Sequence, residues 1–478
     1  SGNDNDFTLT SIDSNNQSSN TPSRTYLQLN PLQKEGTADL SEGNTRVGVD
    51  ANDSIRGTKF ATTGKKYLEV TLNTVNNSYI GVANGSHNPT SFASSNVACL
   101  QKDGDIYIND SPLGSSRSKT FGTGDVVGIL IDADAKKFWQ SVNGTFNSLD
   151  RNSSITLSAS DVLAGTGGFD LSGLTGDDGN YVLHIGNSDG TSADVSINGG
   201  HKAFSHTPPT GYTGWASDDY TAPDFQGKDY FDATLYEGNG AGQKVGDFVP
   251  FTDAYTVDKS AMFEEADKRY LSFTPSSGGD QKTFTFSTWF KLTNGASGQR
   301  NTFLCVDDGS KEAQINHMGD QANKNIKVNF YNGSSFIATL TTAQEIRRED
   351  QWYHLVVAVD TRAAVASANK IKVYINGVQE TLSGTFLSTD DYETEVNSEN
   401  EHNIGRQTNN GIGEPSWYLA ETVMVEGSQL DPTSFGQVDT STNRWVPKNV
   451  SGLTFGDEGW YLEYDGTGFG SGGSGETP

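Results

Sequence analysis

Two acidic stretches hold the residues best suited to bind a metal ion. Asp307 and Asp308 lie in "CVDDGS", where a strand-like run ends at a glycine, and Asp390 and Asp391 lie in the loop "STDDYETEVNSENEHN". Carboxylates and loop carbonyls supply the hard oxygen ligands that calcium prefers. These four residues are therefore candidate calcium ligands. The spacing D-x-D-x-D-G is absent, and solvated acidic loops are the alternative interpretation.

The sequence lacks the common catalytic motifs. No G-x-S-x-G, P-loop, H-E-x-x-H or C-x-x-C pattern occurs, and the seven histidines do not cluster at metal-ligand spacing. His354 lies inside the apolar run "WYHLVVAV", where a structural role is expected. Glu463 and Asp465 are two residues apart, as paired acids of some glycosidases are, but no third acid follows. We therefore expect a protein that is not an enzyme.

The net charge of the chain disfavours some classes of binding partner. The sequence has 33 Lys and Arg residues against 60 Asp and Glu residues, a formal net charge of −27. Such a surface repels phosphate backbones and anionic membranes, so nucleic acid and membrane insertion are not expected. No apolar run reaches the roughly 18 residues of a membrane span. Cys99 and Cys305 lie in strand-like runs of different halves, and we expect two buried free thiols.

Short β-strands must position these residues. The 478 residues predict two or three domains, and 54 glycines with 10% aromatic residues favour an all-β fold rich in turns. "TFTFSTWFKL" alternates, with Phe284, Phe286 and Phe290 on one face and Trp289 on the other. "LDPTSFGQVD" predicts a short helical turn with Asp431 as its N-cap. "TAQEIRRED", residues 342–350, predicts another.

Two similar phrases occur 233 residues apart. Each has an apolar strand that ends in Asp, followed by a hairpin with an Asn-Gly turn, at Asn143–Gly144 and at Asn376–Gly377. Asn-Gly favours a type I′ turn, which needs positive φ at both residues. The flanking phrases differ too much for a recent duplication. We interpret the hairpins as a feature of a shared sandwich architecture that by itself indicates no binding site.

These phrases carry resemblances to known families. "KKYLEVTL", "YIGVA" and "GTGDVVGILIDADAKKFWQSVNGT" resemble a SPRY domain. "FTFSTWFKL", "WYHLVVAVD", "IKVYINGVQE" and "YLAETVMVEG" resemble consecutive strands of a laminin-G/concanavalin A-like jelly roll. The resemblance implies two tandem antiparallel jelly-roll β-sandwiches. The expected organisation is an N-terminal segment (1–25) that completes a neighbouring module, a SPRY-like sandwich (26–216), a linker (217–226), a jelly roll (227–465) and a Gly-rich tail (466–478).

The combination of modules resembles structural proteins of tailed, notably marine, bacteriophages. The phrases "SGNDNDFT", "LNPL", "LSEGN", "WVPK" and "GWYLEYDGTG" carry this resemblance. It implies a virion fibre, spike or capsid-associated appendage at the particle surface, a homo-oligomer that binds itself, other virion proteins or a host-surface glycan. A secreted or cell-surface lectin-like adhesin, an extracellular filament subunit and a polysaccharide-active enzyme are the alternatives.

The family resemblance also implies ligand residues. Laminin-G-like and lectin-like modules bind glycans through exposed aromatic rings, and laminin-G-like modules often bind calcium at a rim of the sandwich. The candidate stacking residues are Trp215, Tyr220, Tyr392 and Trp417, with core or interdomain packing as the alternative for each. Trp139, Trp289 and Trp352 lie within strands and are expected to be structural.

Overall fold

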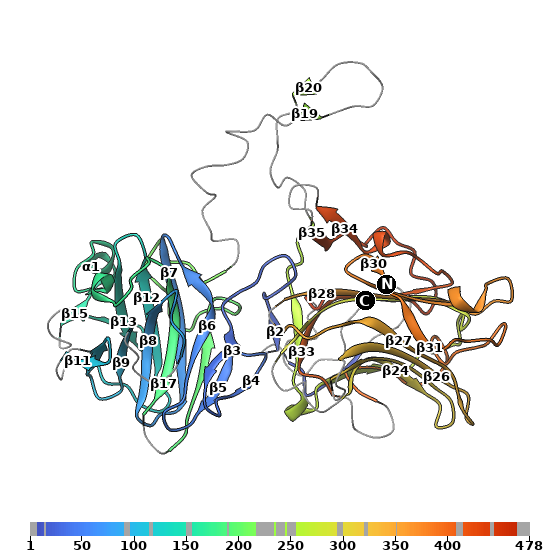
Figure 1. Ribbon diagram of the computed structural model, residues 1–478, viewed down its shortest axis with the longest axis horizontal. Coiled ribbons are helices and arrows are strands. Elements are labelled where there is room, and N and C mark those ends of the chain that lie inside the picture. The colour runs from blue at the N-terminus through green and yellow to red at the C-terminus, as the bar shows by residue number, and fades with distance from the viewer. Residues whose placement is uncertain are drawn as a thin grey trace.

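The chain forms two antiparallel β-sandwiches that lie side by side (Figure 1). The computed structural model describes residues 7–13, 16–89, 96–113, 118–149, 155–188, 191–216, 255–293, 300–319, 324–349, 351–407, 414–439 and 444–465, with the short strands β19 (Thr234–Leu235) and β20 (Lys244–Val245). The predicted all-β, two-sandwich fold is confirmed. Within these residues no helix is long and apolar enough to cross a bilayer.

The first sandwich packs two sheets around one apolar core. One sheet runs in the order β11 (Ser111–Pro112), β10 (Ile106–Ile108), β9 (Val97–Gln101), β8 (Ser78–Asn84), β17 (Tyr181–Asn187), β6 (Ser54–Ala61) and β3 (Leu29–Glu35). The other runs β15 (Thr156–Leu157), β14 (Thr145–Asn147), β13 (Lys137–Val142), β12 (Val126–Asp132), β7 (Lys65–Thr74), β18 (Ala193–Asn198), β5 (Arg46–Val49) and β4 (Asp39–Ser41), with β16 (Phe169–Asp170) beside β13.

The second sandwich also has two sheets. One runs β1 (Thr8–Thr10), β22 (Tyr270–Phe273), β32 (His402–Ile404), β24 (Arg300–Asp307), β25 (Glu312–Met318), β26 (Asn325–Tyr331), β27 (Phe336–Glu345) and β31 (Leu382–Thr385). The other runs β2 (Gln17–Ser18), β21 (Ser260–Phe263), β33 (Trp417–Glu426), β23 (Thr283–Leu292), β28 (Tyr353–Asp360), β29 (Ile371–Ile375) and β30 (Val378–Gln379), with β36 (Trp460–Leu462) beside β33. A hairpin of β34 (Gly436–Asp439) and β35 (Arg444–Pro447) lies outside both sheets.

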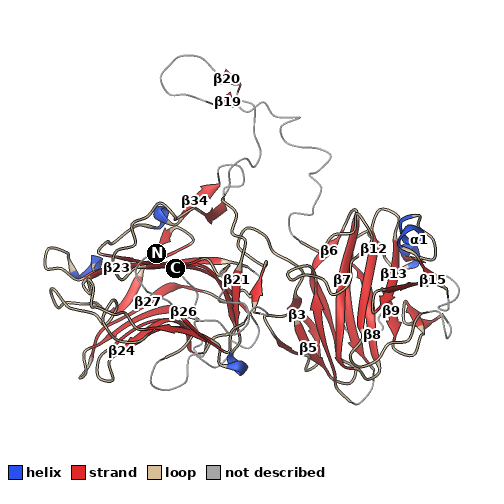
Figure 2. Cartoon of the chain, turned by 180° about the vertical axis from the view of Figure 1, so that it is seen from behind, coloured by secondary structure: helices blue, strands red, loops and turns tan. Residues whose placement is uncertain are grey.

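The helical elements are few and short. Helix α1 (Ala159–Leu163) lies at the end of the first sandwich that faces away from the second (Figure 2). The 3₁₀ turns are η1 (Leu171–Gly173), η2 (Glu265–Asp267), η3 (Ser367–Asn369) and η4 (Pro432–Ser434). The predicted turn at Asp431 is confirmed, because its carboxylate caps η4. The predicted turn at 342–350 is wrong, because β27 extends to Glu345 through pairing with β26.

The N-terminal segment belongs to the second sandwich. β1 and β2 add one edge strand to each of its sheets, before the chain enters the first sandwich. Phe7 is fully buried there, with its ring 4.4 Å from that of Phe273 and 5.0 Å from that of Trp460. The Gln17 side-chain amide donates to the carbonyl of Tyr464 at 2.6 Å. The first and last described segments therefore lie side by side.

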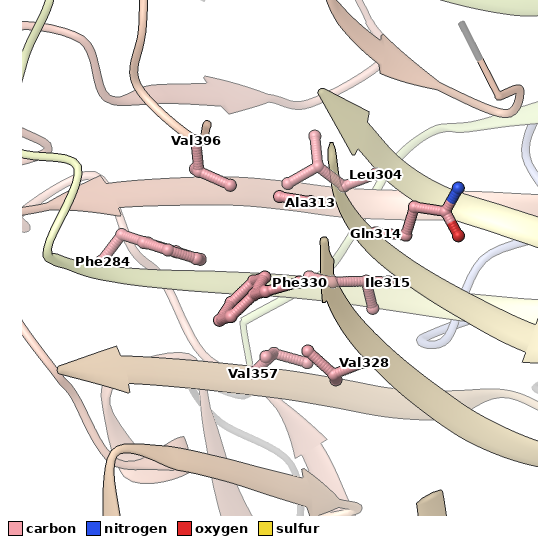
Figure 3. Close-up of a pocket in the computed structure, with 9 residues that line it drawn as sticks. All are labelled: Phe284, Leu304, Ala313, Gln314, Ile315, Val328, Phe330, Val357 and Val396. Atoms are coloured by element: carbon pink, nitrogen blue, oxygen red, sulfur yellow. The ribbon is translucent and has the colours of Figure 1, made fainter. Parts of the chain in front are cut away.

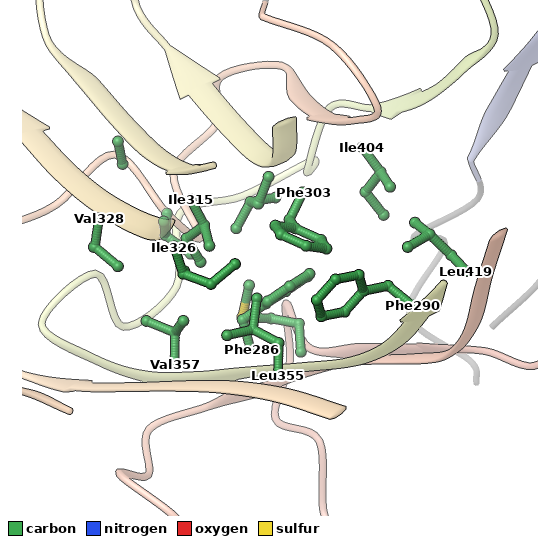
Figure 4. Close-up of a cluster of buried hydrophobic side chains, with 14 of the residues drawn as sticks. Phe286, Phe290, Phe303, Ile315, Ile326, Val328, Leu355, Val357, Ile404 and Leu419 are labelled. Atoms are coloured by element: carbon green, nitrogen blue, oxygen red, sulfur yellow. The ribbon is translucent and has the colours of Figure 1, made fainter. Parts of the chain in front are cut away.

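Strand alternation builds the core of the second sandwich (Figure 4). Phe284, Phe286 and Phe290 enter the core, whereas Trp289 lies on the opposite face of the sheet, as the alternation predicted. Both Asn-Gly turns have positive φ at both residues, as a type I′ turn requires. Cys99 and Cys305 are buried free thiols, which confirms that prediction.

Replacing Phe7 tests whether the N-terminal segment stabilises the second sandwich. Phe7→Ala leaves an apolar cavity, and we expect a loss of about 3 kcal/mol in the free energy of unfolding of this sandwich. Thr8→Ala, at an exposed position of the same strand, is the matched control. Urea unfolding followed by tryptophan fluorescence measures both variants. Equal stability of the two variants would contradict the packing described here.

Candidate functional site

A groove of about 1120 Å³ lies between the two sandwiches. Its first wall is the segment that leaves β2 and enters the first sandwich, together with Lys59 of β6. Its second wall and floor come from the second sandwich. There the lining includes residues 255–259, Trp289, Trp352, the turn residue Asn376 and the β34–β35 hairpin with Trp445. No single sequence stretch forms the groove, because its lining residues come from both modules.

Hydrogen bonds hold the first wall against the second sandwich. The amide of Val257 donates to the Ser23 hydroxyl at 3.0 Å, and the Ser260 hydroxyl donates to the carbonyl of Asn20 at 2.7 Å. Lys259 Nζ donates to the Ser19 hydroxyl at 3.4 Å. The wall is therefore anchored by short polar contacts along its length.

A buried histidine positions two of the groove tryptophans. His354 is fully buried and stacks on Trp289, with ring centroids 4.7 Å apart. Trp445 Nε1 donates to His354 Nδ1 at 2.9 Å, and Nε2 lies 2.9 Å from the Ser287 hydroxyl. Because an indole N–H only donates, Nδ1 must accept and Nε2 carries the proton. Burial lowers the pKa of His354 to about 3, so the ring stays neutral at physiological pH. The expected structural role of His354 thus includes orienting Trp445.

The second Asn-Gly turn lies at the groove. Asn376 lines it and accepts from the backbone N–H of His354 at 2.8 Å. Gly377 has φ +81°, and a Cβ there would lie 2.6 Å from the ring of Trp445. Glycine is required here both for the turn and for the approach of the indole. The second Asn-Gly turn therefore contributes to the lining of the groove, and the hairpin motif by itself still indicates no binding site.

A tyrosine wall rests on a buried carboxyl. The Tyr255 hydroxyl lies 3.1 Å from Glu421 Oε2 and 3.0 Å from the Tyr461 hydroxyl, and Tyr461 donates to the same carboxylate oxygen at 2.5 Å. Glu421 occupies a β-bulge with φ +49°, an uncommon conformation for a side chain of this size. Burial raises the pKa of Glu421 to about 7, and the charges of Glu463 and Asp465 add to the shift. Glu421 supports Tyr255 from behind and does not line the groove itself.

The aromatic residues predicted to stack on sugars occupy other places. Trp215 and Trp417 are 1% and 0% exposed and belong to the cores of the first and second sandwich. Trp417 stacks on Phe303 with centroids 4.3 Å apart. The stacking prediction is wrong for these two, because packing leaves no ring face open. Tyr392 is half-buried against the second core and lies outside the groove, and Tyr220 lies outside the described residues.

The predicted calcium ligands are engaged in local contacts. Asp307 accepts from the amide of Gly309 at 2.6 Å and Asp308 from that of Ser310 at 2.7 Å, which closes the β24–β25 turn. Asp390 pairs with Lys370 at 2.6 Å, and the backbone amide of Asp391 donates to a neighbouring strand end. Over the described ranges, no three His, Cys, Asp or Glu side chains are grouped to hold a metal ion. Calcium binding stays a prediction without an assembled ligand set.

The interior of the second sandwich is closed to ligands. The space between its sheets near Phe284, Phe330 and Val396 is lined almost wholly by apolar side chains and has no room for a water molecule (Figure 3). Tight packing of this kind stabilises the fold and excludes solvent. The groove is thus the larger and more polar space, and the better candidate site.

Sequence reasoning missed the groove residues for identifiable reasons. The structural role predicted for Trp289 is confirmed, because this side chain is 4% exposed and belongs to a buried cluster beside the groove. Trp352 was also predicted to be structural, and Tyr255 and Trp445 were not singled out. One usable signal existed. Trp289 falls on the strand face opposite the core phenylalanines, a large aromatic side chain that needs a cover.

One family model matches part of the second sandwich. Residues 265–417 match the family model of the concanavalin A-like lectin/glucanase superfamily, so the second sandwich contains a laminin-G/concanavalin A-like domain. A comparison of this chain with curated protein sequences found no match.

Several solved structures are similar to parts of this chain at low sequence identity. The SPRY domain of human HERC1 is similar at 12% identity over 35% of this chain and 96% of that chain, with a TM-score of 0.26. A native heptameric SAP-like pentraxin from Limulus polyphemus is similar at 14% identity over 34% and 70%, with a TM-score of 0.24. Domain 4 of the arabinanase AbnA from Geobacillus stearothermophilus, in complex with arabinotriose, is similar at 18% identity over 37% and 74%, with a TM-score of 0.27.

The raised pKa of Glu421 predicts a specific pH dependence of stability. The folded state holds a proton on this carboxyl up to about pH 7, whereas the unfolded chain releases it near pH 4.5, so stability from this group falls as pH rises between these values. Glu421→Gln removes the effect. The variant should gain about 2 kcal/mol over the parent between about pH 5 and pH 8.

Thermal or urea unfolding across this pH range measures the difference. Glu399→Gln, at an exposed position, is the control and should show no such trend. A pH-independent difference between Glu421→Gln and the parent would contradict the assignment of Glu421 as a buried carboxyl of raised pKa.

Proposed function

We propose that this chain is a non-enzymatic carbohydrate-binding structural protein that holds a sugar chain in the groove between its sandwiches. One observation carries the proposal, namely that Trp352, Trp445 and Tyr255 line one open groove together with polar Asn376, around the buried Trp289. Aromatic rings offer flat apolar faces to the C–H faces of sugars, and polar groups beside them bind hydroxyls.

The size of the groove supports an extended ligand. A volume of about 1120 Å³ is at the upper end of typical small-ligand sites, which hold about 300–1,000 Å³. An oligosaccharide segment fills such a space better than a single sugar. The superfamily matched by residues 265–417 is described as lectins and glucanases, two classes that recognise carbohydrates.

The finer part of the proposal concerns where the protein works. A virion-surface fibre, spike or capsid-associated appendage that assembles with itself or other virion proteins and adheres to host-surface glycans is supported by the sequence resemblance to tailed-phage structural proteins. Many weak groove sites on a homo-oligomeric particle would give strong adhesion through multiplicity. A secreted or cell-surface adhesin would use the same groove, and immunogold labelling of purified particles against cell envelopes separates the two.

Glu421 provides the specific reason to test for an enzyme. A carboxyl with a pKa near 7 beside an aromatic groove is the kind of group that acts as a general acid. Against this role, two tyrosines engage it and it is 5% exposed. We expect no reducing-sugar release from any polysaccharide. Release that Glu421→Gln abolishes would overturn the non-enzymatic assignment.

Removing a groove tryptophan tests carbohydrate binding directly. Trp445→Ala and Trp352→Ala should each weaken binding to any glycan identified on an array by about tenfold, equivalent to about 1.4 kcal/mol. Phe336→Ala, which removes a half-exposed ring outside the groove, is the control. Isothermal titration with and without EDTA measures affinity and the predicted calcium dependence together.

The outcomes separate clearly. Binding that both tryptophan variants weaken and Phe336→Ala does not would support the groove. Failure of the parent protein to bind any glycan would overturn the proposed function. Binding unchanged in both tryptophan variants would assign the site elsewhere.

A further inference from the structure

We propose that the groove selects acidic glycans, sugar chains that carry carboxylate or sulfate groups. This inference rests on the proposed function and adds the chemical class of ligand. It depends on the charged residues that line the groove. They are mostly basic, whereas the chain as a whole is acidic.

The groove is locally basic in an acidic protein. Among its described lining residues, the basic side chains are Arg24, Lys59, Lys259 and Arg444, and the acidic side chains are Asp258 and Asp439. The whole chain has 33 basic and 60 acidic residues, so a random patch of this size would be acidic. This reversal of sign occurs on the surface that also holds the tryptophans.

The basic residues lie on both walls. Arg24 and Lys59 belong to the first wall, where the Arg24 guanidinium lies 5.0 Å from the centre of the Tyr26 ring. Lys259 and Arg444 belong to the second sandwich, with Arg444 exposed at the start of β35. A ligand in the groove therefore meets positive charge from two sides and aromatic faces between them.

This arrangement suits a polyanionic sugar chain better than a neutral one. Guanidinium groups bind carboxylates and sulfates through paired, charge-assisted hydrogen bonds, and ammonium groups add a mobile point charge. Sugar rings carrying these groups would stack on the indoles while the acidic substituents reach the walls. The net negative charge elsewhere repels a polyanion, which directs such a ligand to the groove.

Paired glycans that differ only in charge test the inference. One pair is an oligogalacturonate and its methyl ester, which isolates the carboxylate. The other is a sulfated galactan and its unsulfated counterpart, which isolates the sulfate. We expect the acidic member of at least one pair to bind the full chain about tenfold tighter, and this preference to shrink as salt rises.

Single charge-removing variants connect the preference to the groove. Arg444→Gln should weaken binding of the acidic glycan by about fivefold and leave the neutral glycan within about twofold. Lys119→Gln makes the same change in net charge at an exposed position outside the groove and should leave both affinities unchanged. Circular dichroism verifies that the variants are folded.

Different binding results would overturn the acidic class of ligand and the proposed function. Equal binding of acidic and neutral members, with Trp445→Ala still weakening both, would overturn the acidic class and keep the proposed function. An equal loss in Lys119→Gln would assign the preference to overall charge and overturn the groove's role in it. Absence of binding to all four glycans and to a glycan array would overturn the proposed function itself.

Discussion

The groove depends on a buried hydrogen-bonded junction around Gly43, between β4 and β5. The carbonyl of Gly43 accepts from the Gln28 side-chain amide at 2.6 Å and from the Tyr418 hydroxyl at 3.1 Å, which joins the first sandwich to β33 of the second. Gln28 also accepts from Lys291 of β23. A Cβ at Gly43 would lie 2.2 Å from the Tyr418 hydroxyl oxygen, so this contact exists only because residue 43 is glycine. This junction joins the two sandwiches whose residues line the groove.

Chain order reinforces the junction. The segment Thr8–Ser18 completes both sheets of the second sandwich, and only then does the chain cross to build the first. The first sandwich is therefore inserted between parts of the second. The crossing segment becomes a groove wall because both of its ends are fixed, one by strand pairing with β21 and the other by the bridge between Tyr26 and Ala216. Ordering the wall in advance lowers the entropy cost of binding a ligand.

Local sequence patterns predicted the features that depend on interactions between residues close together in the sequence. The alternation of "TFTFSTWFKL" and the Asn-Gly turns depend on neighbouring residues, and these features match the structure. The groove could not be predicted in this way, since Trp289 and Trp445 are far apart in sequence, and Arg24 and Lys59 join them only through the packing of the first module against the second. Burial of Trp417 was missed for a related reason. Its strand is central in its sheet, and the loop-like residues before it gave no sign of this.

Two buried titratable groups behind the groove change the pH dependence of stability in opposite directions. Protonation of the unfolded chain at His354 favours unfolding as pH falls from about 6.5 toward 3, so this group makes stability rise with pH in that window. Glu421 makes stability fall with pH between about 4.5 and 7. Their slopes oppose each other where the windows overlap. Since His354 orients Trp445 and Glu421 supports Tyr255, both groups that support the aromatic surface are in their neutral forms across mildly acidic pH.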